Sequence, residues 1–122
     1  MEQFNFERPV AWQHSKTLVK DVYRLTASFP HSELYALTNQ IRRAVVSIGS
    51  NIAEGAGRRA AKEQAHFYEI AYGSLTELLC QMIFAYELGY IDAEELRTLR
   101  QSIDELARML SGLKKSRLTP NP

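Results

Sequence analysis

Apolar residues recur every three or four positions in four stretches of this chain of 122 residues, and short connections separate the stretches. Such spacing puts apolar side chains on one face of an α-helix, which has about 3.6 residues per turn. The pattern predicts helices near residues 10–28, 33–56, 60–88 and 92–113, with 114–122 as a frayed tail. The last stripe is the clearest and consists of Leu96, Leu99, Ile103, Leu106, Leu110 and Leu113.

Residues that favour helix ends stand close to the predicted boundaries. Pro30 is expected to stop the first helix, and Ser32 is a candidate cap for the second. Gly89 is expected to close the third helix, since glycine accepts the left-handed conformation common there. Asp92, followed three residues later by Glu95, predicts a capping box at the start of the fourth helix.

Short connections force consecutive helices to lie antiparallel, because so few residues can only turn the chain back on itself. The sequence therefore predicts an all-α protein, an antiparallel up-and-down four-helix bundle. At this length the whole chain, residues 1–122, is expected to form a single domain.

Overall charge carries little information about partners, because 15 Lys and Arg against 14 Asp and Glu leave a net charge of +1. The single cysteine, Cys80, cannot form an internal disulfide and is expected to be a small buried apolar residue. The N-terminus lacks the apolar run of a secretion signal, and no stretch is apolar enough to cross a membrane. We therefore expect a cytoplasmic protein with no membrane partner.

Motifs for catalysis or metal binding are weak. The glycine-rich stretch 49–57 lacks the lysine of a phosphate-binding loop and follows no strand. Glu63 and His66 have the spacing of a di-iron ligand pair, but no second Glu-x-x-His pair exists in the chain. The sequence predicts no catalytic residue, no metal and no cofactor, and hence a protein that is not an enzyme.

The second predicted helix carries an unusual stripe of small residues away from its apolar face. Long charged side chains would be expected on a face that meets only water. Two interpretations remain, a second contact within the chain or an interface between subunits. The residues of the predicted subunit interface are Arg43, Val46, Ser47, Ser50, Ala53 and Glu54.

Positive charge is concentrated in residues 36–62, where five basic residues face Glu54 alone and give a local charge of +4. A solvated face is one interpretation, and binding of nucleic-acid phosphates is the other. The candidate nucleic-acid-binding residues are Arg42, Arg43, Arg58, Arg59 and Lys62.

The stretch QIRRAVVSIGSNIAEGAGRR at residues 40–59 resembles the signature of the four-helix proteins named for the 23S rRNA intervening sequence. Further matches are AYGSLTEL at residues 71–78 and LGYI at residues 88–91. The resemblance covers about residues 10–113. The family usually has proline at the position of Gly49, where either residue weakens a helix.

The resemblance implies a four-helix up-and-down bundle that often forms a cyclic pentamer. A similar relative, the accessory variability protein of diversity-generating retroelements, forms a basic pentameric barrel and binds nucleic acid and a reverse transcriptase. We therefore expect a homo-oligomer, with a pentamer favoured, that binds structured RNA through a basic rim. The alternative is a scaffold that docks a protein partner such as a reverse transcriptase.

Overall fold

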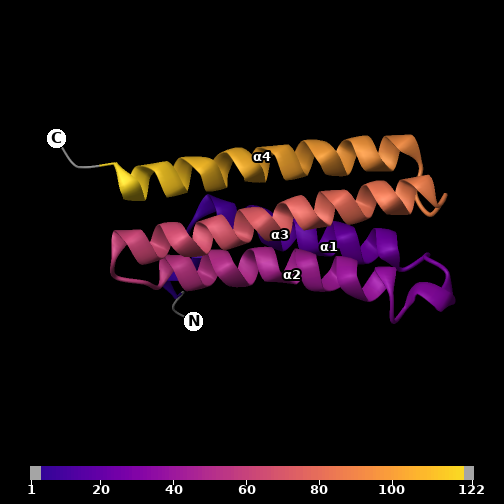
Figure 1. Cartoon of the computed structure of the whole chain (residues 1–122), viewed down its shortest axis with the longest axis horizontal. Coiled ribbons are helices and arrows are strands. Elements are labelled where there is room, and N and C mark those ends of the chain that lie inside the picture. Colours follow the sequence, from indigo (N-terminus) through magenta and orange to yellow (C-terminus); the bar gives the residue numbers. More distant parts are fainter. Residues whose placement is uncertain (1–3, 120–122) are drawn as a thin grey trace.

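The computed structural model describes residues 4–119, and four long α-helices make up most of this part of the chain (Figure 1). They are α1 (Val10–Thr26), α2 (Leu37–Ala56), α3 (Ala61–Glu87) and α4 (Ala93–Leu118). Two short 3₁₀ helices, η1 (Asn5–Glu7) and η2 (His31–Glu33), precede α1 and α2. No strand occurs among residues 4–119.

The long helices lie side by side with roughly parallel axes, and the connections between consecutive helices alternate between the two ends (Figure 1). Helix α2 packs against α1 and α3, α3 packs against α4, and α1 also contacts α4. These four contacts close a bundle around one core. The predicted all-α four-helix fold is confirmed.

The core is built from the apolar stripes read in the sequence. Ile103, the chosen marker of the fourth stripe, is only 4% exposed. Each long helix contributes fully buried side chains, which include Leu18, Val22, Ile41, Ile48, Leu75, Met82, Leu106 and Leu110. Helical periodicity in the sequence therefore identified the buried faces correctly.

Helix α2 begins four residues later than residue 33, the predicted start, and Ser32 does not cap it. Residues His31–Glu33 form η2 instead, and the cap position of α2 is Ala36, which has no side-chain hydrogen bond. The carboxylate of Glu33 accepts a hydrogen bond of 2.8 Å from the Tyr90 hydroxyl. This contact holds η2 against the turn between α3 and α4. Local sequence signals do not predict it, because the two residues are 57 positions apart.

Helix α4 continues to Leu118, so the prediction of a frayed tail is wrong for residues 114–118. The ammonium group of Lys114 lies 3.5 Å from the Glu69 carboxylate on α3. Arg117 lies beside the phenol of Tyr68, also on α3. These contacts hold the last turns of α4 against α3. The remainder of the predicted tail, residues 120–122, lies outside the described residues.

Two of the predicted boundary signals, the Asp92–Glu95 capping box and Gly89, act as predicted. The Asp92 carboxylate accepts a hydrogen bond of 2.7 Å from the Glu95 amide, and the Glu95 carboxylate accepts one of 2.9 Å from the Asp92 amide. Gly89 has a φ of +82° after the end of α3. The amide of Tyr90 then donates to the Ala85 carbonyl at 2.9 Å, which satisfies an orphan carbonyl of the helix end.

Replacing Ile103 tests whether the α4 stripe supports the core. Ile103→Ala is expected to lower the free energy of unfolding by about 2–5 kcal/mol, because it removes buried methyl groups and leaves a cavity. Urea denaturation followed by circular dichroism measures this loss. The control Arg100→Ala changes an exposed neighbour and is expected to cost less than about 0.5 kcal/mol. Equal losses for both variants would contradict the assignment.

Candidate nucleic-acid interface

The α2–α3 connection and the end of α4 lie at the same end of the bundle (Figure 1), and both segments are rich in basic residues. The α2–α3 connection and the first turn of α3 supply three of the five predicted binding residues. The last turns of α4 add three more cations, because the helix continues past residue 113. We call this set the basic end: Arg58, Arg59, Lys62, Lys114, Lys115 and Arg117.

Only part of the positive charge at the basic end is neutralised. Arg58 pairs with Glu54 at 3.0 Å, and its guanidinium group lies 4.8 Å from the centre of the Phe67 ring. Arg59, Lys62 and Lys115 are exposed, and none of them has a carboxylate within 4.0 Å among the described residues. These three side chains are free to contact an anionic ligand.

The buried side chain of Tyr68 on α3 contacts Arg117 of the basic end. Burial raises the pKa of its phenol above 10.0, and the positive charge of Arg117 partly opposes that shift. The phenol therefore stays neutral, and the Arg117 charge is not cancelled by a tyrosinate. A β-carbon at Gly55 would lie only 2.8 Å from the Tyr68 ring. Glycine at this position is what lets the ring pack under α2.

The other two predicted binding residues, Arg42 and Arg43, lie elsewhere. Arg42 lies 14 residues before Ala56, the last residue of α2, so about 21 Å of helix separates it from the α2–α3 connection that carries Arg58. Arg42 donates a hydrogen bond of 2.9 Å to the Thr26 hydroxyl and lies 4.6 Å from the centre of the Tyr23 ring. The five predicted residues therefore occupy two separate surfaces.

The stripe of small residues on α2 faces two directions. The Ser47 hydroxyl is 2.9 Å from the Ser74 hydroxyl on α3, so this position makes a contact within the chain. Val46, Ser50 and Ala53 line a groove of about 490 Å³ between α1 and α2. The intramolecular interpretation therefore applies to Ser47, and the other members remain at the surface or half-buried. Their role as a subunit interface stays a prediction.

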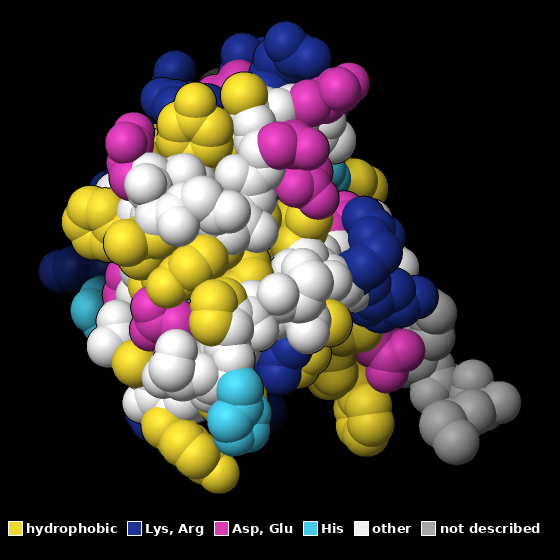
Figure 2. All heavy atoms as spheres, turned by 90° about the vertical axis from the view of Figure 1, so that its right-hand side faces the viewer, with side chains coloured by type: hydrophobic (Ala, Val, Ile, Leu, Met, Phe, Trp, Pro, Cys, Tyr) yellow, Lys and Arg dark blue, Asp and Glu magenta, His cyan; other side chains and the backbone are white. Residues whose placement is uncertain are grey.

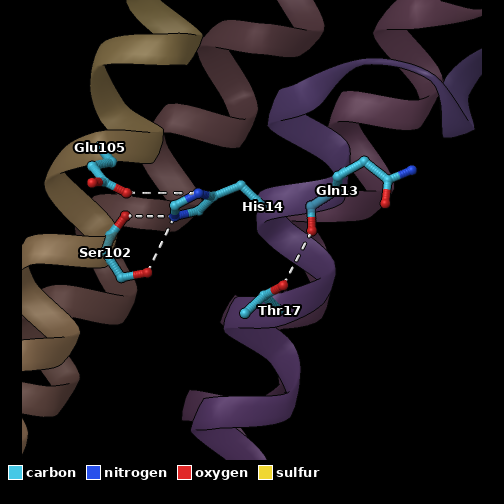
Figure 3. Close-up of polar contacts among 5 residues, drawn as sticks. All are labelled: Gln13, His14, Thr17, Ser102 and Glu105. Carbon is cyan, nitrogen blue, oxygen red and sulfur yellow. Dashed lines mark hydrogen bonds and ion pairs between the residues drawn. The ribbon is translucent and has the colours of Figure 1, made fainter.

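His14, Ser102 and Glu105 form a polar contact between α1 and α4 (Figure 3). His14 Nε2 lies 3.0 Å from the Ser102 carbonyl oxygen and 3.1 Å from its hydroxyl. A carbonyl oxygen only accepts, so Nε2 carries the hydrogen and cannot take a proton from the hydroxyl. The geometry ties two helices together and does not activate Ser102 as a nucleophile.

Two further predictions concern single residues. Cys80 is exposed, so the prediction of a buried cysteine is wrong. It lies on the outward face of α3, a face that carries several other exposed apolar side chains. His66 is at the surface, as expected.

No group of three or more His, Cys, Asp or Glu side chains among residues 4–119 could hold a metal ion. In the same range, no helix combines the length and apolar character needed to cross a bilayer.

The sequence interpretation missed the contribution of α4 to the basic end. Lys114, Lys115 and Arg117 were assigned to a tail, although the run of cations continues directly from the last apolar residue of the stripe. That continuity is the signal that could have extended the helix. The contact of Lys114 with Glu69 that stabilises it joins residues far apart in sequence.

Alkaline titration tests the buried environment of Tyr68. A phenol with a raised pKa in the folded state stabilises the fold below pH 10, and this contribution is lost as the pH rises through the folded pKa. Tyr68→Phe is therefore expected to lose less stability than the wild type above pH 10. Urea denaturation at several alkaline pH values measures the difference. Tyr35→Phe, at an 89% exposed position, is the control and should follow the wild type.

Comparison with known protein families agrees with this architecture. No protein with a curated description matches the sequence. The profile of the 23S rRNA-intervening sequence proteins matches residues 7–112, which include all of α1, α2 and α3 and most of α4. The chain belongs to the 23S rRNA-intervening sequence protein family.

Proposed function

We propose that this protein is a non-enzymatic homo-oligomer that binds structured RNA through its basic end. The observation that carries the proposal is the convergence of cations from the α2–α3 connection and from the last turns of α4. Three of them, Arg59, Lys62 and Lys115, have no carboxylate partner among the described residues. The family name, which refers to an intervening sequence of 23S rRNA, supports RNA as the ligand.

Phosphate binding explains why such cations stay unpaired. Contacts from Lys and Arg to phosphates release condensed counterions, and this release drives the association. One subunit offers few contacts and carries a net charge of only +1. An oligomer would repeat the basic end in each copy, so that weak contacts act together through a high effective concentration. Assembly and RNA binding therefore support one another.

The assembly contact in this proposal is the ridge shared by α2 and α3. Ser47, which contacts Ser74 across the two helices, is a small residue on the α2 side of this ridge and allows a neighbouring subunit to approach closely. Ile70 and Phe84 on α3 are 39% and 54% exposed, and their spacing of 14 residues returns them to one strip after about four turns. Exposed apolar side chains of this size are typical of interaction surfaces. A pentamer is the expected form, from the family resemblance.

A scaffold that docks a protein partner is the second candidate. It is favoured by the end of the bundle opposite the basic end, where hydrophobic side chains spread over the centre and acidic ones lie where α4 begins (Figure 2). Tyr35 and Leu88 are 89% and 57% exposed there. These side chains could bury against a partner protein, whereas they offer no charge to phosphate.

Salt titration tests the RNA proposal. The wild type is expected to bind a labelled RNA hairpin with an affinity that falls steeply with salt concentration. Arg59→Ala/Lys62→Ala/Lys115→Ala should flatten the log–log slope by about two units, since each lost phosphate contact contributes about 0.7. Fluorescence anisotropy at several salt concentrations measures the slope.

The matched control for this titration is Arg97→Ala/Arg100→Ala/Arg108→Ala, which removes three exposed cations from the outer face of α4. It should leave the slope close to that of the wild type. An unchanged slope in the basic-end variant, or no hairpin binding by the wild type at low salt, would leave the scaffold function as the better explanation.

Light scattering tests the assembly proposal. The wild type is expected near 70 kDa, the mass of a pentamer of about 13.9 kDa subunits. Ile70→Arg and Phe84→Arg place a long charged side chain on the shared ridge and should each shift the mass to that of a single subunit, with unchanged helical content. A wild-type protein that is monomeric at micromolar concentration would refute the proposal.

A further inference from the structure

The outer surface between α1 and α2 holds two adjoining hollows of about 490 and 450 Å³, which meet at Val46. We call their union the α1–α2 groove. Its floor on the α2 side consists of Gly49, Ser50 and Ala53, so small residues keep it open. Its length from Trp12 to Tyr23 corresponds to about 16 Å along α1.

Four cations border the α1–α2 groove: Lys16, Lys20, Arg42 and Arg43. No Asp or Glu lines either hollow. None of the four has a carboxylate within 4.0 Å among residues 4–119. Other cations of the bundle, in contrast, pair with acids, namely Arg24, Arg58, Arg97, Arg108 and Lys114. The α1–α2 groove therefore carries four cations that have no ion-pair partner among the described residues.

Aromatic rings stand beside these cations. The Lys16 ammonium lies 5.2 Å from the centre of the Trp12 ring, and the Arg42 guanidinium lies 4.6 Å from that of Tyr23. Tyr23 is 40% exposed, and Trp12 is half-buried with its ring against the edge of Phe6. Cationic grooves with aromatic platforms bind single-stranded nucleic acid, because phosphates meet the charges while bases stack on the rings.

We infer that the α1–α2 groove binds unpaired nucleotides of RNA. Lys16, Lys20, Arg42 and Arg43 contact the phosphates, and the rings of Trp12 and Tyr23 accept stacked bases. The inference rests on the proposed function in that RNA is the ligand, but it assigns a surface separate from the basic end. A structured RNA would then place its helical part on the basic end and a loop or tail in the groove.

An acidic polypeptide is the competing occupant, because it would satisfy the same cations. The two rings at the groove favour nucleic acid, since the side chains of Asp and Glu carry no aromatic ring that could stack on them. Duplex RNA fits less well, because its bases are already stacked on one another and are not available to aromatic side chains. These ligands therefore give different results at the ring of Trp12.

Trp12 is the single tryptophan of the chain, so its fluorescence reports on the groove alone. A short oligouridylate is expected to quench this fluorescence in the wild-type protein. Lys16→Glu/Lys20→Glu should weaken the affinity by about tenfold and reduce the salt slope by more than one unit. The matched control, Arg97→Glu/Arg100→Glu, reverses two charges on α4 and should leave the quenching unchanged. The four substituted residues, Lys16, Lys20, Arg97 and Arg100, are exposed, and circular dichroism verifies that both variants fold.

Further measurements distinguish RNA binding in the groove from RNA binding at the basic end. Oligouridylate should still quench Trp12 in the variant that lacks the three basic-end cations Arg59, Lys62 and Lys115. If hairpin RNA binds but oligouridylate never quenches Trp12, the groove is not an RNA site and the proposed function stands. If neither RNA binds, both are refuted. Equal quenching by oligoglutamate or by blunt duplex RNA would overturn the inference alone.

Discussion

Close approach of α2 to both of its neighbours is the constraint on which the rest of the structure depends. A β-carbon at Gly49 would lie 2.9 Å from the Ser15 hydroxyl on α1, and one at Gly55 would lie 2.8 Å from the Tyr68 ring on α3. Ser15 cannot easily yield, because its side chain is buried and its hydroxyl donates to the Trp12 carbonyl at 2.7 Å. Each glycine weakens the isolated helix by about 1 kcal/mol relative to alanine. That cost is offset by the packing that the glycines allow, and the same packing positions Trp12 beside the groove and Tyr68 beneath the basic end.

Periodicity predicted the helices because burial of one apolar face is a property of each segment by itself. Ile103 on α4 is buried as its spacing indicates, and the Asp92–Glu95 capping box forms because both partners lie within one turn. The helix ends that were predicted wrongly depend on distant partners. Glu33 holds η2 through Tyr90, 57 residues away, and Lys114 extends α4 through Glu69. Nothing in the neighbouring residues encodes such contacts.

The candidate site shows the same division between local and tertiary information. Counting charge along residues 36–62 found Arg58, Arg59 and Lys62, but it joined them to Arg42, which lies about 21 Å from the end of α2 along the helix axis. The count also missed Lys115, which only the fold brings to the same end. Lys16 and Lys20 escaped notice for a further reason. They belong to α1, where Lys16, Lys20 and Arg24 against Asp21 give a local charge of only +2, and their significance arises from the groove that α1 forms with α2.

A net charge of +1 is compatible with strongly basic surfaces, because most acidic residues of the chain lie away from the cations of the basic end and the α1–α2 groove. Acidic residues are concentrated in the first turn of α4, at the end of the bundle opposite the basic end. There they interact favourably with the positive end of the helix dipole. Salt screens the field of each exposed charge beyond the Debye length, which is about 8 Å at physiological salt. A polyanion such as RNA is therefore attracted only weakly at long range, whereas its phosphates interact strongly with these cations in direct contact. For such a protein, the number of contacts made at once determines the affinity, and assembly of several copies is the most direct way to raise it.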